Sequence, residues 1–204
     1  MVEPLEVADV PTPIGIFRVV YQGAHVRVVD LLENGVHQTG VPPGAIRRKP
    51  PFPAASPPRQ LSEYFRGART DFVVEVDPDT SSAFDRAVWT QLRKVPAGQT
   101  TTYGDLARKS GFPGSARAVG GAMARNPIPI IIPCHRVIGT GGAITGFGLG
   151  LWRKRWLLDH EGAWPIRSWS AEGPRGRAQR TLDGTWKGSE APPSESKATT
   201  ASSN

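Results

Sequence analysis

Chemistry on this chain would centre on its single cysteine, Cys134, which stands directly before His135 and Arg136. A thiol becomes a good nucleophile when a base or a nearby cation favours the thiolate. A histidine can accept the thiol proton, and a carboxylate can orient the histidine. Adjacent side chains need not face each other, so a water can lie between sulfur and imidazole. Because a lone cysteine is more often a small buried hydrophobic residue, this adjacency alone does not establish a nucleophile.

The segment that leads to Cys134 is predicted to be rigid. Prolines at positions 127, 129 and 133 forbid a helix and disfavour a regular central strand. The isoleucines between them predict that this extended segment is nevertheless buried. The glycines at 139–142 predict a turn after the cysteine, and those at 146, 148 and 150 predict a flexible loop.

Helices are expected on both sides of this segment. The first begins near Ser81 or Ser82 and ends before Pro96. Two short helices follow, one from Thr102 to Gly111 and one over residues 116–125, and their short linker predicts a helix-turn-helix. The last covers residues 151–160 and carries Arg153, Lys154 and Arg155 on one side.

The first 80 residues predict a small sheet with a helix. Residues 1–11 read as a loose leader, and β-branched residues around Gly23 predict a hairpin. Residues 40–59 predict an exposed proline-rich loop. Residues 61–67 predict a short helix and residues 71–77 a further strand. We therefore expect an α/β (α+β) protein with an N-terminal domain at 1–80, a helical domain at 81–162 and a disordered tail at 163–204.

Composition narrows the function classes. No apolar run approaches the roughly 20 residues of a membrane span, and the N-terminus lacks signal-peptide features. A single cysteine suits a reducing cytoplasm and excludes a structural zinc site built on several thiolates. The net charge of +7 is concentrated between residues 85 and 161, where 11 Lys and Arg face four Asp and Glu. Such a field predicts nucleic-acid binding, with a basic solvated surface as the alternative.

The stretch Ile130–Val137 closely resembles the active-site motif of the O6-alkylguanine-DNA alkyltransferases, the methylated-DNA–protein-cysteine methyltransferases. Further blocks fall in the family's order: Trp89, 95–99, 102–107, 116–122, 126–127 and 156–162. The resemblance is strong over residues 82–162. It is weaker at residues 12–15 and 61–67.

The resemblance implies catalytic and pocket roles. Cys134 would attack the alkyl carbon on guanine O6, His135 would be its base through a water, and Glu161 would hold the histidine. Asn126 would brace the turn, and Tyr103 would donate a hydrogen bond to the purine. The backbone carbonyls of Cys134 and Val137 would recognise the exocyclic amine of guanine, and the amide of Gly148 would approach O6. Met123 and Phe147 would form walls of the pocket.

The helix at 116–125 is implied to bind DNA. Arg117 would fill the space left by the flipped nucleotide, since the reacting atom lies inside the base stack. Small side chains would allow close approach to DNA, although taken alone they point first to tight packing inside the protein. The further DNA contacts expected are Ala116, Ala118, Gly121, Ala122 and Arg125. Phosphate contacts from the basic segment would supply most of the affinity.

The implied activity is DNA repair by irreversible, single-turnover transfer of methyl or larger alkyl groups from O6 of guanine to Cys134, with O4 of thymine as a second candidate atom. No cofactor or metal is implied. The expected partner is double-stranded DNA, bound in the minor groove without sequence preference by a cytoplasmic monomer. Phe147 replaces the tyrosine of some members, which bears on lesion preference. Three rivals remain open: a non-enzymatic alkyltransferase-like damage sensor, a helix-turn-helix regulator and a Cys-His-Glu thiol hydrolase.

Overall fold

The computed structural model describes residues 3–32, 41–76 and 81–163, and the backbone of 179–180 and 186–187. Residues 1–168 form one compact unit, which contains strands β1 to β7 and helices α1 to α5. In a second unit, β8 (Gln179–Arg180) pairs antiparallel with β9 (Trp186–Lys187). The predicted disordered tail, apart from residue 163 and these strands, lies outside the described residues. Within the described part of the chain, no helix has the length and apolar character to cross a membrane.

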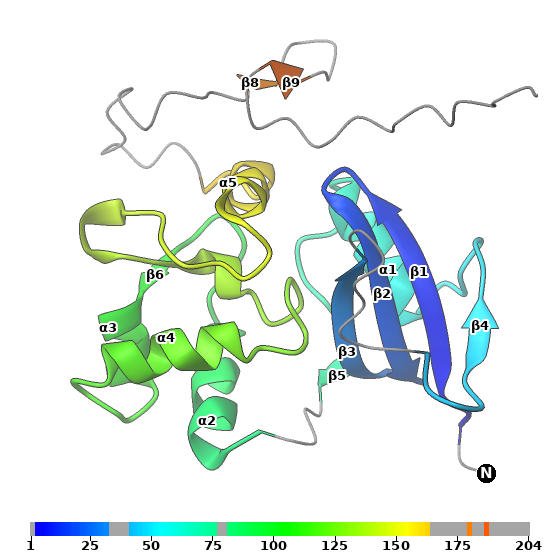
Figure 1. The fold of residues 1–204 in the computed structure, drawn as a ribbon, viewed down its shortest axis with the longest axis horizontal. Helices are drawn as coiled ribbons and strands as arrows, with labels where there is room; N and C mark the ends of the chain where they lie inside the picture. The colour runs from blue at the N-terminus through cyan, green and yellow to red at the C-terminus, as the bar shows by residue number, and fades with distance from the viewer. Residues whose placement is uncertain (1–2, 33–40, 77–80, 164–178, 181–185, 188–204) are drawn as a thin grey trace, which may run out of the picture. The chain divides into compact units, whose positions relative to one another are not determined.

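A five-stranded mixed sheet forms the N-terminal part (Figure 1). Its strands are β1 (Glu6–Thr12), β2 (Gly15–Gln22), β3 (His25–Leu32), β4 (Ile46–Arg48) and β5 (Glu75–Val76), in the order β4-β1-β2-β3-β5. The antiparallel β2–β3 pair confirms the predicted hairpin. Its turn uses Gly23 at a φ of +57°, a backbone conformation that glycine adopts at little cost.

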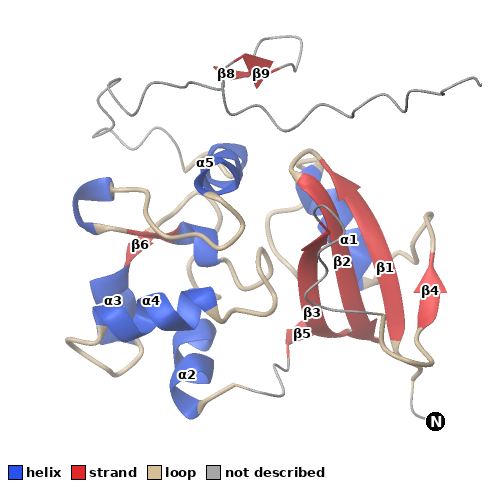
Figure 2. Ribbon diagram, viewed as in Figure 1, coloured by secondary structure: helices blue, strands red, loops and turns tan. Residues whose placement is uncertain are grey.

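Helix α1 (Pro57–Phe65) packs against β1 and β2 (Figure 2). Its apolar side chains meet the inner face of the sheet, and Phe65 stacks on Phe17 of β2 with ring centroids 5.8 Å apart. Gly67, at a φ of +73°, follows the helix end as predicted. Burial of Leu61 and Tyr64 on the same helix completes this core.

Three predictions for the N-terminal part were wrong in detail. The supposed leader at residues 1–11 contains most of β1, whose Val7 and Val10 are buried. The expected exposed loop at 40–59 holds β4 and the first turn of α1, and Phe52 within it is buried. Of the strand expected at 71–77, only β5 is regular.

The helical part contains α2 (Ala83–Leu92), α3 (Tyr103–Lys109), α4 (Ala116–Ala124) and α5 (Leu151–His160). The helix starts predicted at Ser82 and Thr102 are confirmed by side-chain caps: Ser82 Oγ accepts from Asp85 N at 3.0 Å, and Thr102 Oγ1 accepts from Asp105 N at 3.1 Å. Ser115 precedes α4 but makes no side-chain cap bond. Helices α3 and α4 pack together as the expected helix-turn-helix.

A short parallel pair, β6 (Thr101–Thr102) with β7 (Val137–Ile138), joins the two ends of this part. Strand β7 follows a single 3-10 turn at Cys134–Arg136, and β6 runs directly into α3. A second 3-10 turn, Thr140–Gly142, precedes the loop to α5. The pairing therefore holds Tyr103, the first residue of α3, beside the turn that carries Cys134.

Candidate active site

Cys134 is buried, with 6% of its surface exposed, and lines a cavity of about 480 Å³. The same cavity is lined by five further residues that were predicted from the sequence, namely Asn126, Met123, Phe147, Gly148 and Arg125. The lining also includes Val28, Val29 and Asp30 of β3, which were not anticipated. The N-terminal sheet thus contributes one side of the cavity that the thiol faces.

Asn126 braces the turn that leads to the cysteine. Its Nδ2 donates to Ile132 O at 2.8 Å, and its Oδ1 accepts from Ile128 N at 3.0 Å. One side chain thereby ties both ends of a segment whose three prolines donate no hydrogen bonds. Between them Ile130 has a φ of +76°, a left-handed conformation that is costly for a β-branched residue. This strain has no signal in the sequence.

His135 lies behind the cysteine in a fully buried position. Its Nε2 is 2.9 Å from Glu161 Oε1, whose side chain is 1% exposed. Burial lowers the pKa of His135, although the facing carboxylate opposes this, so the imidazole is neutral. The carboxylate oxygen can only accept, so Nε2 carries the proton and Nδ1 is the free acceptor. Nδ1 makes no hydrogen bond with any described residue.

Arg136 is not the cation that acts on the thiol. Its Nε donates to Glu161 Oε2 at 2.9 Å, its Nη2 to Glu161 Oε1 at 2.7 Å and its Nη1 to Val95 O at 2.6 Å. Burial alone would raise the pKa of Glu161, but hydrogen bonds from His135 and Arg136 and the charge of Arg136 hold it far below its usual range. Glu161 therefore stays a carboxylate at neutral pH.

The cation beside the thiol is Lys154, a residue that sequence reasoning placed among the DNA-binding charges. Its side chain is 0% exposed. Its Nζ donates to Val137 O and Thr145 O, both at 2.6 Å, and to Gly146 O at 3.3 Å, which uses all three donors. Burial lowers the pKa of Lys154 to about 8, while the Cys134 thiolate favours the charged form. Lys154 thus fixes the loop after the cysteine and supplies positive charge to the site.

The thiol itself is not strongly acidic at rest. Burial raises the pKa of Cys134, and this outweighs the opposing effects of Asn126 and Lys154. A buried thiol of this kind remains protonated until a base takes the proton. A nucleophilic role for Cys134 would therefore require a base.

Tyr103 stands at the other side of the site and is half-buried. Its hydroxyl donates to Thr145 O at 3.3 Å, a long bond that a better acceptor could replace. Burial is the main cause that raises the pKa of Tyr103, so it remains a donor. Val137 O, expected to recognise an exocyclic amine, already accepts from Lys154 and retains one lone pair.

Helix α4 presents only part of its small-residue stripe to solvent. Arg117 and Ala118 are exposed, whereas Ala116 and Gly121 are half-buried. Ala122 is fully buried, and its carbonyl accepts from Trp89 Nε1 at 3.1 Å, so its expected DNA contact was wrong. Arg125 is exposed but pairs with Asp85 at 2.7 Å.

The charge of α5 is also distributed differently from expectation. Arg153 and Lys154 are buried, and Arg155 alone of the three is exposed. Arg153 Nε donates to Ile14 O at 2.8 Å, which ties α5 to the turn between β1 and β2. Part of the basic excess in residues 85–161 therefore serves the interior.

Known proteins resemble this chain over most of its length. Residues 83–163 match the family described as 6-O-methylguanine DNA methyltransferase, DNA binding domain. A methylated-DNA–protein-cysteine methyltransferase of Mycolicibacterium paratuberculosis is 41% identical over 157 residues, which span 76% of this chain and 90% of the relative.

Solved structures give the same result over both halves of the fold. The Mycobacterium tuberculosis O6-methylguanine methyltransferase has a TM-score of 0.65 and 38% identity, covering 78% of this chain and 93% of that one. The same protein in complex with DNA gives a TM-score of 0.66 at 37% identity, with the same coverage. The expected two-part α+β architecture is confirmed, and this chain belongs to the methylated-DNA–protein-cysteine methyltransferases, a family of DNA repair enzymes.

Proposed function

We propose that this protein repairs O6-alkylguanine in double-stranded DNA by moving the alkyl group onto Cys134. The observation that carries this is the burial of the only thiol against a cavity with the His135–Glu161 pair behind it. The sulfur attacks the alkyl carbon, the bond from that carbon to O6 breaks, and a thioether forms. No described group offers a route back to the thiol, so each molecule acts once.

The proton path follows from the tautomer. With Nε2 held by Glu161, His135 Nδ1 takes the thiol proton through a water. Tyr103 donates to the purine ring as negative charge develops on the departing guanine, in exchange for its long bond to Thr145 O. Met123 and Phe147 enclose the base, the amide of Gly148 approaches O6, and the carbonyls of Cys134 and Val137 accept from the exocyclic amine.

DNA is bound through α4, with the damaged nucleotide rotated out of the stack. Arg117 occupies the vacated space, and Ala116, Ala118 and Gly121 permit close approach to the minor groove. Exposed cations, among them Arg125 once it leaves Asp85, contact phosphates and give an affinity that falls with salt but does not depend on sequence. We assign this work to residues 81–162 of a cytoplasmic monomer that needs no cofactor.

Intact-protein mass spectrometry after incubation with duplex DNA containing one O6-methylguanine tests the proposal. The expected result is a gain of one methylene per protein, mapped to Cys134 and absent in Cys134→Ala. An unchanged mass with retained lesion-selective binding would identify a damage sensor instead. Repeated turnover on an ester would identify a thiol hydrolase, and tight binding to one DNA sequence a regulator.

A further inference from the structure

Tyr64 brings a hydroxyl from the N-terminal sheet domain into the catalytic network. It lies on α1, is 1% exposed, and its Oη donates to Glu161 Oε1 at 2.7 Å. That oxygen is the same atom that faces His135 Nε2 at 2.9 Å. A residue 97 positions away in sequence from Glu161 thus shares the acceptor that orients the proposed base.

Glu161 Oε1 receives three donors in total, from Tyr64, His135 and Arg136. Each additional donor spreads the negative charge of the carboxylate and restricts its rotation. Arg136 holds both carboxylate oxygens from one side, through Nε to Oε2 and Nη2 to Oε1. Tyr64 supplies a bond from the opposite part of the chain, so the position of Oε1 is determined by both.

The position of the Tyr64 hydroxyl is set by its own surroundings. The ring contacts Phe65, Phe72 and His160, with centroids 5.3, 5.4 and 5.2 Å away. The backbone carbonyl of Tyr64 accepts from His160 Nε2 at 2.7 Å, next to Glu161 in sequence. Both the side chain and the backbone of Tyr64 therefore form hydrogen bonds with residues at the C-terminal end of α5.

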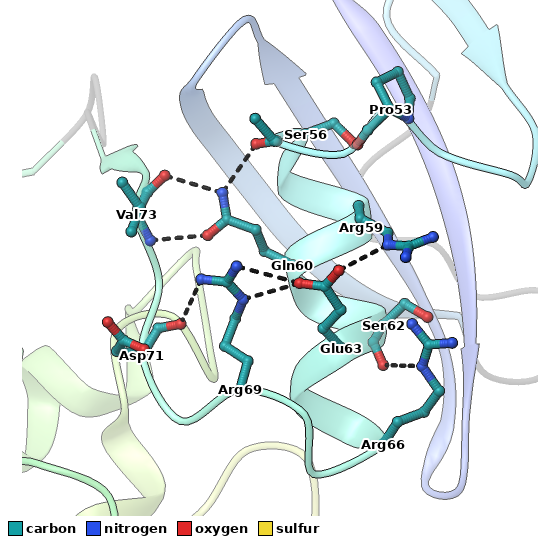
Figure 3. A network of polar contacts seen from close by, with 11 residues as sticks. Pro53, Ser56, Arg59, Gln60, Ser62, Glu63, Arg66, Arg69, Asp71 and Val73 are labelled. Carbon is teal, nitrogen blue, oxygen red and sulfur yellow. Dashed lines mark hydrogen bonds and ion pairs between the residues drawn. The ribbon is translucent and has the colours of Figure 1, made fainter.

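A polar network keeps the segment that carries Phe72 against α1 (Figure 3). The Gln60 side chain donates to Val73 O at 3.0 Å and accepts from Val73 N at 2.8 Å. Glu63 binds Arg69 at 3.2 Å and Arg59 at 2.8 Å. These bonds do not involve the catalytic network, so the ring of Tyr64 is held in place independently of Glu161.

We propose that Tyr64 is a positioning residue for alkyl transfer: its hydroxyl fixes the Glu161 carboxylate against His135 Nε2, so that His135 keeps the tautomer whose Nδ1 accepts the thiol proton. This inference rests on the proposed function. It gives the N-terminal sheet a part in the reaction besides walling the cavity. Tyr64 touches neither substrate nor the reacting atoms and acts only through Glu161.

The test compares Tyr64→Phe with Tyr21→Phe. Both substitutions remove one hydroxyl from a tyrosine that is 1% exposed in the N-terminal part, but Tyr21 lies on β2 and faces Glu6. The single-turnover rate of methyl transfer from O6-methylguanine in duplex DNA is measured from pH 5 to 9, together with the urea unfolding curve and the DNA affinity. We expect Tyr64→Phe to lower the rate at pH 7 roughly tenfold, the factor for one hydrogen bond to a charged group.

The pH profile separates positioning from simple stabilisation. Without the tyrosine donor, more negative charge remains on Oε1, which favours protonated His135, so the acidic limb of the profile moves to higher pH. Tyr21→Phe is expected to overlay the wild type. If Tyr64→Phe overlays it too, the inference is wrong. If the wild type itself transfers no methyl group, the proposed function fails first, and that outcome is distinct.

A measurement on the unaltered protein covers the case in which Tyr64→Phe does not fold. Nitrogen-15 chemical shifts of the His135 ring report which nitrogen carries the proton. We expect a protonated Nε2 and an unprotonated Nδ1 at pH 7. A proton on Nδ1 would overturn the inference without any substitution, because the carboxylate would then not be setting the tautomer.

Discussion

The pKa of buried Lys154 makes the stability of this protein depend on pH in an unusual direction. Lys154 is 0% exposed, and burial lowers its pKa from 10.5 to about 8. A fall of this size disfavours the charged form in the folded protein by about 3 kcal/mol. Between those two pKa values the unfolded chain binds more protons than the folded one. The free energy of unfolding therefore rises as pH rises through this window and falls again on return to pH 8.

The perturbation is Lys154→Met, which keeps the length of the side chain and removes the charge. Both proteins carry Cys134→Ser, because a titrating thiol would otherwise contribute in the same range. Urea unfolding is followed at half-unit steps from pH 7 to 10. Between pH 8 and pH 10, the free energy of unfolding of the protein with Lys154 is expected to rise by about 2 kcal/mol relative to that of the Lys154→Met protein.

Lys109→Met is the matched control, since Lys109 is exposed at the end of α3. Its unfolding curves are expected to run parallel to those of the parent at every pH. Parallel curves for Lys154→Met as well would refute the reasoning, because they would mean that the ammonium is solvated in the folded state. The loss of its three hydrogen bonds to backbone carbonyls changes the curves by a constant and does not affect this comparison.

Three further outcomes are expected. Glu161→Gln leaves the Arg136 guanidinium buried without its carboxylate, so the free energy of unfolding at pH 7, measured by urea titration, is expected to fall by about 3–5 kcal/mol. A much smaller fall would mean that the Arg136 side chain moves to solvent in the variant. Asn126→Ala strands one amide and one carbonyl of the proline turn, costs about 2–4 kcal/mol and slows methyl transfer measured by mass. Arg117→Ala weakens binding to lesion DNA but keeps the slope of affinity against salt, whereas a phosphate contact would reduce that slope by about 1.

Elements whose signals lie within one turn of chain were predictable from the sequence. The caps at Ser82 and Thr102 each bind an amide three residues on, so the residue type and its spacing contain the whole interaction. The stop at Gly111 similarly needs only a positive φ, which is +89° here. The rigid approach to Cys134 followed from three prolines, whose ring geometry constrains the backbone in any fold.

Strand β1 was missed because prolines near both ends of residues 4–11 suggest a loop. Its parallel pairing with β4 covers only residues 6–8. Pro11 has no backbone N–H to donate, but β4 does not extend to Pro11, so no hydrogen bond to that strand is lost. Antiparallel pairing with β2 over the whole strand, from Glu6 opposite Tyr21 to Thr12 opposite Gly15, decides the matter. No pattern within residues 1–11 contains that information.

The sequence prediction put Lys154 with Arg153 and Arg155 on one side of the last helix, in the basic segment expected to contact phosphates. The spacing held a contrary signal, since Lys154 lies three and four residues before Leu157 and Leu158, which puts all three on one helical face. Both leucines are fully buried. A charge on the apolar face of a helix indicates a buried functional group, but only the structure identifies the carbonyls that receive it.

The raised pKa of the Cys134 thiol is compatible with a reactive cysteine once the timing of proton loss is considered. A permanently ionised thiolate in a buried site would need strong compensation, and Asn126, Lys154 and the backbone amides of Cys134 and His135 do not outweigh the effect of burial. A neutral His135 beside a fixed Glu161 offers an acceptor whose proton affinity the folded chain sets in advance. Ionisation can then wait until the damaged base displaces solvent from the cavity, when the same positive charge on Lys154 acts more strongly. A protein that acts once per molecule gains from this order, because a thiol that stays protonated between encounters resists reaction with other alkylating agents.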